Sequence, residues 1–377
     1  MAGRAEEGPA AAAASGRKAV CVTGAGGYIA SWLVKLLLSR GYAVHATVRD
    51  LNPPLPWRCF RRREDGAPQA AAEGLRLRFP RTQAFQADLL DYDAMAAAIA
   101  GCRGVFHVAT PVPSGNLTDP EANRFKELVP GCKRMREMLG PAVTGTKNVL
   151  EAASAANVRR VVVVSSMVTV EINPKNWPKD KIKDESCWSD KEFCRNNEDW
   201  YSVAKITSEE VALEYGRQIG LDVVTINPAL VLGPLLQPMC NTSCQFLVYF
   251  LKGGPDRMRD KLWHIVDVRD VADALLLLYE APAASGRHIC APHFIGARDQ
   301  LRLLKKMYPG YPCINEESID DMDNPAPMTS DKLRKLGWSC RPLEETIADT
   351  IEFCEQAGFL GDSQGSPCRF PPVYNKI

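Results

Sequence analysis

Residues 18–41 constrain the fold of this chain most strongly, because a short apolar strand, a glycine-rich turn and an amphipathic helix follow one another directly. Within the turn, at residues 23–30, Gly24 permits a tight reversal and Gly27 lets the backbone approach a pyrophosphate closely. Ala30 is small enough for close packing of the helix on the strand. A phosphate would lie at the helix N-terminus, against free N–H groups and the positive end of the helix dipole. The segment predicts a dinucleotide-binding unit, with a structural turn that binds no ligand as the alternative.

Strand-like and helix-like segments then alternate as far as about residue 230. Residues 158–166 are an almost unbroken β-branched run, which is typical of a strand buried on both faces of a parallel sheet. This alternation predicts βαβ units in a doubly wound parallel sheet, so the expected fold class is α/β. The other expected strands are residues 42–50, 82–91, 104–110 and 221–234, and the expected helices are residues 91–102, 140–157 and 198–210.

The regularity fades after about residue 230, where a strand and helix at residues 263–282 and helices between residues 330 and 360 suggest a smaller C-terminal lobe. Two segments have the composition of surface excursions, a Pro/Arg-rich one at residues 51–69 and a charged one at residues 124–139. The predicted organisation is a disordered leader at residues 1–17, a dinucleotide-binding domain at residues 18–230, a mainly substrate-binding lobe at residues 231–362 and a tail at residues 363–377.

Charge and cysteine content exclude several classes of function. The net charge is +1, which offers no electrostatic footprint for nucleic acid or an anionic membrane, and no apolar run has the length of a membrane span. Glu6 and Glu7 lie where a signal peptide needs a basic start, and they also disfavour a transit peptide. The 13 cysteines form no CxxC pair and no zinc-ligand grouping, so we expect no metal site. Reduced thiols without a secretory signal predict a cytoplasmic protein.

The ends of the expected strands suggest which dinucleotide is bound. Arg49, at the end of the second strand, would accommodate the 2′-phosphate of NADP, whereas an acidic residue there would bind the 2′-hydroxyl of NAD. Asp50 is one residue late for that competing role. Asp88 and Leu89 end the third strand and residues 108–110 end the fourth, so they would flank the adenine and the phosphates. Ordinary strand-end residues remain the alternative.

Tyr201 and Lys205 lie four residues apart on one face of an expected helix. A tyrosine–lysine pair at this spacing arises easily by chance, but this one follows the strand that ends in Ser166. A carbonyl that accepts a hydride develops negative charge on oxygen and needs a proton donor. A free phenol, with a pKa of about 10, is a weak donor, and a neighbouring ammonium would lower its pKa. We therefore predict that Tyr201 donates a proton, Lys205 tunes it and Ser166 holds the same oxygen.

These residues together resemble the extended short-chain dehydrogenase/reductases, whose pattern is TGxxGxxA, a serine and YxxxK. The segment DESCWSDKEFC at residues 184–194 is more specific and resembles the plant branch of cinnamoyl-CoA reductases and dihydroflavonol reductases. The segments at residues 141–153, 226–238 and 283–290 are similar to the cinnamoyl-CoA reductase side of that branch. The likeness covers about residues 18–360.

The resemblance implies a Rossmann domain, NADP(H) as cofactor and reduction of a hydroxycinnamoyl thioester to an aldehyde in lignin and phenylpropanoid metabolism, with a link to plant defence. The implied partner is a small phenolic substrate. By position, the family's catalytic residues match Ser166, Tyr201 and Lys205. The implied cofactor contacts are Gly24, Gly27, Tyr28, Ile29, Arg49, Asp88, Leu89, Val108, Ala109, Thr110, Tyr201, Lys205, Pro228, Ala229, Leu230, Val231 and Ser243.

Two of the chain's departures from the family pattern bear directly on the site. Ser202 stands where a cysteine is usual, so a redox pair with Cys194 is absent. The basic residues suited to CoA phosphates in the family correspond here to Phe246, Tyr249 and Arg269. Two alternatives stay open: reduction of a phenolic ketone or aldehyde without CoA, and a catalytically weak NADP-binding protein with a regulatory role. Four nearby basic residues could replace the CoA-binding charges if the substrate is a CoA thioester, and would otherwise be solvated surface charges: Lys252, Arg257, Arg259 and Lys261.

Overall fold

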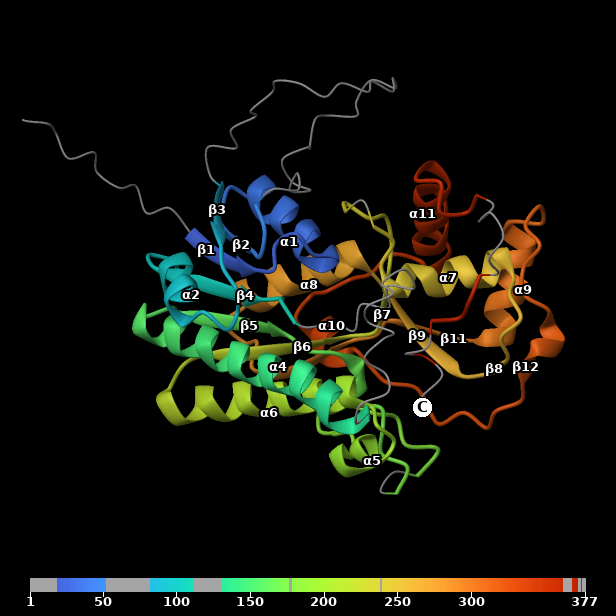
Figure 1. Cartoon of the computed structure of the whole chain (residues 1–377), viewed down its shortest axis with the longest axis horizontal. Helices are drawn as coiled ribbons and strands as arrows, with labels where there is room; N and C mark the ends of the chain where they lie inside the picture. Colours follow the sequence, from blue (N-terminus) through green and yellow to red (C-terminus); the bar gives the residue numbers. More distant parts are fainter. Residues whose placement is uncertain are drawn as a thin grey trace, which may run out of the picture.

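The computed structural model describes residues 19–51, 82–110, 130–175, 178–237, 239–361, 368–371 and 374. The predicted leader and nearly all of the Pro/Arg-rich segment lie outside these residues. The centre of the molecule is a seven-stranded sheet in the order β10-β6-β5-β4-β1-β2-β3, and every pairing within it is parallel (Figure 1). The strands are β1 (Ala19–Thr23), β2 (Ala43–Val48), β3 (Thr82–Gln86), β4 (Gly104–His107), β5 (Arg160–Val164), β6 (Val223–Pro228) and β10 (Gly286–Cys290).

Helices cover both faces of this sheet, as Figure 1 shows: α1 and α8 lie on one side and α2, α4 and α6 on the other. All residues of β4 and β5 are buried, which agrees with their apolar sequences. The strand order reverses between β1 and β4, so a crevice for a ligand is expected at their carboxyl ends. The predicted α/β doubly wound fold is confirmed. The helices are α1 (Tyr28–Ser39), α2 (Tyr92–Ile99), α4 (Pro130–Ala155), α6 (Trp200–Ile219) and α8 (Val268–Glu280).

Two expected boundaries differ from the structure. Helix α4 begins at Pro130, so residues 130–139 of the predicted charged excursion continue a helix expected to start at residue 140. The apolar stretch at residues 221–234 forms two strands in different sheets, β6 and β7 (Leu230–Leu232). Pro228 lacks an N–H group, so it ends the ladder of the large sheet and the chain turns away after it.

The C-terminal part contains a small sheet of β7, β9 and β11 beside the large one. It does not begin cleanly at residue 230: β10 pairs with β6, and α8 packs on α1. The assignment of residues 231–362 to a substrate-binding lobe therefore stays a prediction, and β10 and α8 belong structurally to the large sheet. The remaining elements are α5 (Lys191–Asn196), α7 (Thr242–Lys252), β8 (Met258–Arg259), β9 (Leu262–Asp267), β11 (His293–Gly296), α9 (Ala297–Met307), β12 (Ile319–Asp320), α10 (Asp331–Lys335), α11 (Leu343–Gln356) and 3-10 turns at Met167–Thr169 and Glu316–Ser318.

None of the helices in the described part of the chain combines the length and the hydropathy that crossing a bilayer requires.

Candidate active site

The glycine-rich turn joins β1 to α1 at the strand reversal. Gly24 has a φ of +64°, and a Cβ atom there would lie 2.8 Å from the Cβ of Ala109. Only glycine fits this position without a shift, because the backbone is left-handed and the end of β4 is so close. The amide of Gly24 donates to the Thr47 hydroxyl at 3.2 Å, and that of Ala25 donates to the Thr47 carbonyl oxygen at 2.9 Å. The turn is thereby fixed against β2.

The N-terminus of α1 has the properties of a phosphate site. Gly27 is its N-cap residue, no side chain in the described chain caps the helix, and its first turn, which contains Tyr28 and Ile29, carries no acid. Free N–H groups without a competing carboxylate suit an anion. The residues present therefore fit the pyrophosphate of a dinucleotide.

The side chain of Tyr28 has a structural task. Its hydroxyl donates to the Gly233 carbonyl oxygen at 2.6 Å, and the Trp32 indole donates to the Pro234 carbonyl oxygen at 2.8 Å. These bonds tie α1 to the chain after β7. The Tyr28 side chain is consequently committed, and only its backbone remains for a cofactor.

The end of β4 is fixed by Thr23, whose hydroxyl accepts hydrogen bonds from the amides of Val108 and Ala109 at 3.0 and 3.1 Å. His107 lies behind this junction, with its Nδ1 3.0 Å from the Thr23 hydroxyl. Burial lowers the pKa of His107 to about 3, and the charge of Lys205 adds to this effect. The imidazole is therefore neutral and forms part of the wall, while Thr110 follows at the strand end.

The predicted adenosine contacts lie at neighbouring strand ends. Arg49 and Asp50 directly follow β2 and are exposed. Asp88 accepts the Leu90 amide at 2.9 Å, and the Leu89 carbonyl oxygen accepts from the Asn148 side chain at 2.8 Å. This loop is thus held against α4. An arginine at this edge fits a 2′-phosphate, in agreement with the chemistry expected of NADP.

The stretch of predicted contacts from Pro228 to Val231 is buried throughout and leads from β6 into β7. The Ala229 amide donates to the Cys290 carbonyl oxygen at 3.0 Å. Ser243, near the start of α7, donates to the Val231 carbonyl oxygen at 2.6 Å. Ser243 therefore lies beside this stretch, and its role as a cofactor contact stays a prediction.

Tyr201 and Ser166 come together from different elements. Ser166 lies just after β5 and caps the 3-10 turn Met167–Thr169. Tyr201 lies in the first turn of α6. Burial raises the pKa of Tyr201 above its ordinary value, and the nearby Ser166 side chain acts in the opposite direction. The expected net lowering of this pKa by Lys205 is therefore wrong for this structure, because burial dominates. The phenol is protonated at neutral pH, which is the form that can donate.

The start of α6 is fixed by Asp199, which accepts the Ser202 amide at 3.2 Å and also the Ser202 hydroxyl. Ser202 is almost fully buried. The N-cap residue Asp199 therefore holds Ser202, the residue that stands in place of the family's cysteine, and so fixes the first turn of α6, where Tyr201 lies.

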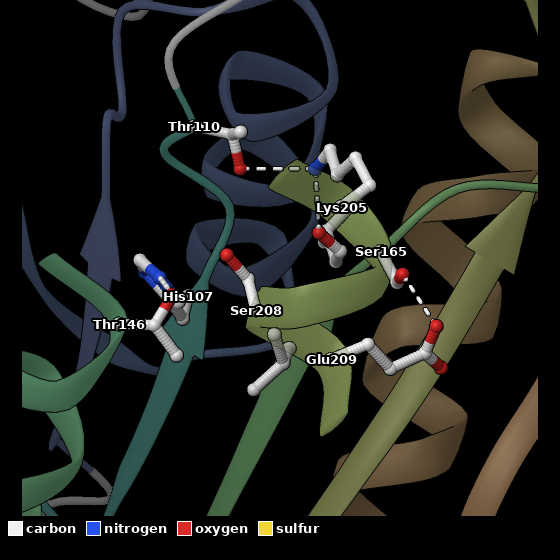
Figure 2. A pocket seen from close by; sticks show the side chains of 9 residues that line it. His107, Thr110, Thr146, Ser165, Lys205, Ser208 and Glu209 are labelled. Carbon is white, nitrogen blue, oxygen red and sulfur yellow. Dashed lines mark hydrogen bonds between the residues drawn. The ribbon is translucent and has the colours of Figure 1, made fainter. Parts of the chain in front are cut away.

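The ammonium group of Lys205 points toward the end of β4 (Figure 2). It donates to the Thr110 hydroxyl at 2.9 Å and to the Val164 carbonyl oxygen at 3.1 Å. Burial lowers the pKa of Lys205 to about 8, and the carboxylate of Glu209 partly opposes this. Beside it lies a cavity of about 10 Å³, lined also by Thr146 and Ser208, which is room for about one water molecule.

Glu209 is a buried acid beside the site that the sequence prediction missed. It is 1% exposed and accepts hydrogen bonds from the hydroxyls of Ser165, Thr169 and Thr225 at 2.6–2.7 Å. Burial acts to raise its pKa, but Arg287, at 3.1 Å, and these hydroxyls outweigh it and leave the pKa below its usual value. Its position one helical turn after Lys205 was the available signal. The network fixes the segment that carries Ser166.

The positions corresponding to the family's CoA-binding charges are occupied differently. Phe246 and Tyr249 are fully buried in the core, and Arg269 pairs with Asp267 at 2.7 Å and Asp349 at 2.6 Å. Three of the four suggested substitutes already have partners. Arg257 pairs with Asp320, and Lys261 lies 3.8 Å from the Glu171 carboxylate. Lys252 donates to the Gly361 carbonyl oxygen, and Arg259 is exposed.

Two family models match this chain. The NAD dependent epimerase/dehydratase family matches residues 132–290, and the NmrA-like family matches residues 16–186. Among solved structures, alfalfa vestitone reductase superposes with a TM-score of 0.72 at 28% identity, over 91% of this chain and 99% of that one. A yeast methylglyoxal/isovaleraldehyde reductase in complex with NADPH has a TM-score of 0.68 at 24% identity, over 90% and 99%, which supports the fold.

Among curated proteins, cinnamoyl-CoA reductase 1 of Petunia hybrida is 40% identical over 90% of this chain and 93% of its own length. Cinnamoyl-CoA reductase 2 of Arabidopsis thaliana is 40% identical over 93% of this chain and 96% of its own length. Tetraketide alpha-pyrone reductase 1 of the same plant is 34% identical over 90% of this chain and 96% of its own length. The chain belongs to the cinnamoyl-CoA reductase-like branch of the extended short-chain dehydrogenase/reductases, and with it to the NADP(H)-dependent oxidoreductases.

Proposed function

We propose that this protein reduces a phenylpropanoid carbonyl, with a hydroxycinnamoyl-CoA thioester as substrate and the corresponding aldehyde as product. The observation that carries the proposal is the placement of the buried Lys205 ammonium, one helical turn after Tyr201 on α6, at the carboxyl end of β4, where it donates to the Thr110 hydroxyl at 2.9 Å. Ser166 lies near enough to Tyr201 to lower the pKa of its phenol. This constellation lies at the carboxyl edge of the sheet, beside the turn suited to a dinucleotide. The names of the curated relatives support the same substrate class.

Each residue has a definite task in the reaction. NADPH, when bound, supplies the hydride. The Ser166 hydroxyl orients the carbonyl oxygen of the substrate, and the Tyr201 phenol donates its proton to that oxygen as negative charge develops. For a thioester the resulting hemithioacetal then releases the CoA thiol and leaves the aldehyde.

The remaining contacts position the cofactor. Lys205 in its ammonium form would hold the nicotinamide ribose and stabilise the phenolate left on Tyr201 after proton transfer. Arg49 would bind the 2′-phosphate, and the first turn of α1 would bind the pyrophosphate. The strand-end residues Asp88, Leu89, Val108, Ala109 and Thr110 would border the adenosine and the phosphates.

A second candidate is reduction of a phenolic ketone or aldehyde without CoA. It is favoured by the burial of Phe246 and Tyr249 and by the pairing of Arg269, because phosphate recognition depends on available charged donors. We also propose a cytoplasmic location and a role in phenylpropanoid and lignin metabolism or plant defence. Every cysteine in the described ranges is an unpaired thiol, in agreement with a reducing compartment.

NADPH oxidation measured with hydroxycinnamoyl-CoA thioesters and with the matching free aldehydes tests the proposal. Turnover of the thioesters with aldehyde as product supports the first candidate, and turnover of the free carbonyl compounds alone supports the second. Tight NADPH binding without turnover of any of these substrates would overturn both and leave a regulatory role.

A further inference from the structure

The small cavity beside the catalytic lysine also borders a buried carboxylic acid. Lys205 and Glu209, from successive turns of α6, both line this space of about 10 Å³ (Figure 2). Side chains four residues apart on a helix have Cβ atoms about 5–6 Å apart. Because the cavity has room for about one water molecule, little solvent screens the two side chains from each other. Charges interact strongly across such a space.

Glu209 is held in its ionised form by donors on both carboxylate oxygens. The hydroxyls of Thr169 and Thr225 each donate to it at 2.6 Å, and the Asn227 side-chain amide lies 2.9 Å from both oxygens. The guanidinium of Arg287 adds a charged contact at 3.1 Å. Such donors favour the carboxylate form, and the pKa of Glu209 lies below its usual value. A negative charge is therefore present one helical turn after Lys205.

The ammonium of Lys205 hydrogen-bonds only neutral groups among the described residues. They are the Thr110 hydroxyl at 2.9 Å and the Val164 carbonyl oxygen at 3.1 Å. Burial of a lysine favours its neutral amine, so a side chain that is 6% exposed needs a compensating charge to remain an ammonium. Glu209 acts in that direction and raises the pKa of Lys205 against the effect of burial.

Other charges near Lys205 do not supply this compensation. His107 of β4 is neutral, because burial lowers its pKa to about 3. Arg287 of β10 is a cation, and Asp199 at the start of α6 does not line the cavity. Strand β6 and the turn Met167–Thr169 contain no charged side chain. The described charged side chains of α4 and α5 lie outside the cavity lining as well: Lys147, Glu151, Lys191, Glu192 and Arg195.

We propose that Glu209 is a positioning residue of the active site, whose carboxylate keeps the buried Lys205 side chain in its ammonium form. The ammonium is the form that would hold the nicotinamide ribose and stabilise the phenolate on Tyr201. Without the negative charge, burial would leave a larger share of Lys205 as the neutral amine near pH 7. The inference rests on the proposed function, because it names a residue that supports the same proton-donating pair.

The experiment measures the deprotonation midpoint of Lys205 directly, by NMR titration of the purified protein labelled with ¹³C at the lysine Cε atoms. The signal of Lys205 is the one that disappears in Lys205→Arg. Glu209→Gln should lower the midpoint from about 8 by about one pH unit, the lower end of the effect of an opposite charge at this range, since Arg287 shares the carboxylate. Glu209→Asp keeps the charge and should return the midpoint to near pH 8.

Thr225→Val is the matched control for a purely structural role. It removes one hydroxyl that donates to Glu209 and leaves the carboxylate charged, so it should destabilise the fold without moving the Lys205 midpoint. A folded Glu209→Gln variant with the midpoint of the wild type would overturn the proposal. An equal fall in Thr225→Val would also contradict it, because loss of packing in the network would then suffice.

If Glu209→Gln does not fold, the double variant Glu209→Gln/Arg287→Leu takes its place. Its midpoint should still fall, by about half a pH unit, because the more distant Arg287 contributes less to Lys205 than Glu209 does; an unchanged or higher midpoint would contradict the proposal. The titration needs no substrate. Absence of turnover in the wild type would therefore overturn the proposed function, while the midpoints still decide the role of Glu209.

Discussion

Lys205 donates a hydrogen bond to the hydroxyl of Thr110 at 2.9 Å, across 95 positions of sequence. This bond joins the catalytic face of α6 to the carboxyl end of β4, next to the glycine-rich turn. The buried ammonium is therefore held where a dinucleotide and the Tyr201 phenol would meet. The pair links the cofactor part of the site to its proton-donating part.

The fall of kcat/KM at alkaline pH should reflect the deprotonation of Lys205. Its pKa is lowered to about 8, chiefly by burial, so the ammonium is present below that pH and is lost above it. Because kcat/KM reports groups of the free enzyme, it should fall as the pH rises through about 8. Stopped or continuous NADPH assays from pH 6 to pH 10 measure this profile.

Lys205→Arg is the test of that assignment, because a guanidinium keeps its charge throughout the range. The variant should be less active but should lack the limb near pH 8. An unchanged limb in Lys205→Arg would assign it to another group.

Arg49 should determine the preference for NADPH over NADH. Arg49→Ala should weaken NADPH binding about 10- to 100-fold, since a hydrogen bond to a charged group is worth about 1.5–3 kcal/mol. The affinity for NADH, which has no 2′-phosphate, should change little. Fluorescence titration of both dinucleotides gives the two dissociation constants. Arg103→Ala, an exposed site before β4, is the control, and an equal loss for both dinucleotides in Arg49→Ala would argue against phosphate recognition.

Glu209→Gln should destabilise the fold by about 3–5 kcal/mol, because it leaves the buried guanidinium of Arg287 without its counter-charge. The free energy of unfolding from urea denaturation measures the loss. Glu209→Gln combined with Arg287→Leu should recover part of it. Glu214→Gln, on the exposed surface of α6, should leave the stability unchanged; a similar loss there would remove the significance of the buried pair.

The buried histidines should make the protein acid-labile. Burial lowers the pKa of His107 to about 3 and those of His264 and His288 to about 4. An imidazole in the unfolded chain has a pKa of about 6.5, so the unfolded state binds more protons and stability falls as the pH drops below that value.

Between pH 7 and pH 5 each of these imidazoles should cost about 2 kcal/mol of unfolding free energy. Urea denaturation at the two pH values measures the total, and His288→Leu should reduce the difference by about that amount. A pH dependence identical to that of the wild type would show that His288 is accessible to protons in the folded state.

The sequence predicted the sheet well because its signals are local. The β-branched run at residues 158–166 and the glycine turn at residues 23–30 each identify an element without reference to the rest of the chain. Ser166, Tyr201 and Lys205 were accessible for the same reason, since their spacing relative to a strand and a helix is local.

The features that escaped prediction depend on packing between distant segments. The joining of β10 to the large sheet, the network around Glu209 and the placement of Tyr374 beside Trp263 each unite residues far apart in sequence. The direction of the Tyr201 pKa shift was missed because burial, its largest cause, is a property of the folded interior.

The most direct measurement is the turnover of Tyr201→Phe with NADPH and 4-hydroxycinnamoyl-CoA, beside the wild type and Tyr215→Phe, a control on the same helix. The account predicts that Tyr201→Phe loses at least about 100-fold in kcat, the usual contribution of a general acid, and still binds NADPH as tightly as the wild type. Tyr215→Phe should retain full activity. A Tyr201→Phe variant with wild-type turnover would contradict the assignment of Tyr201 as the proton donor.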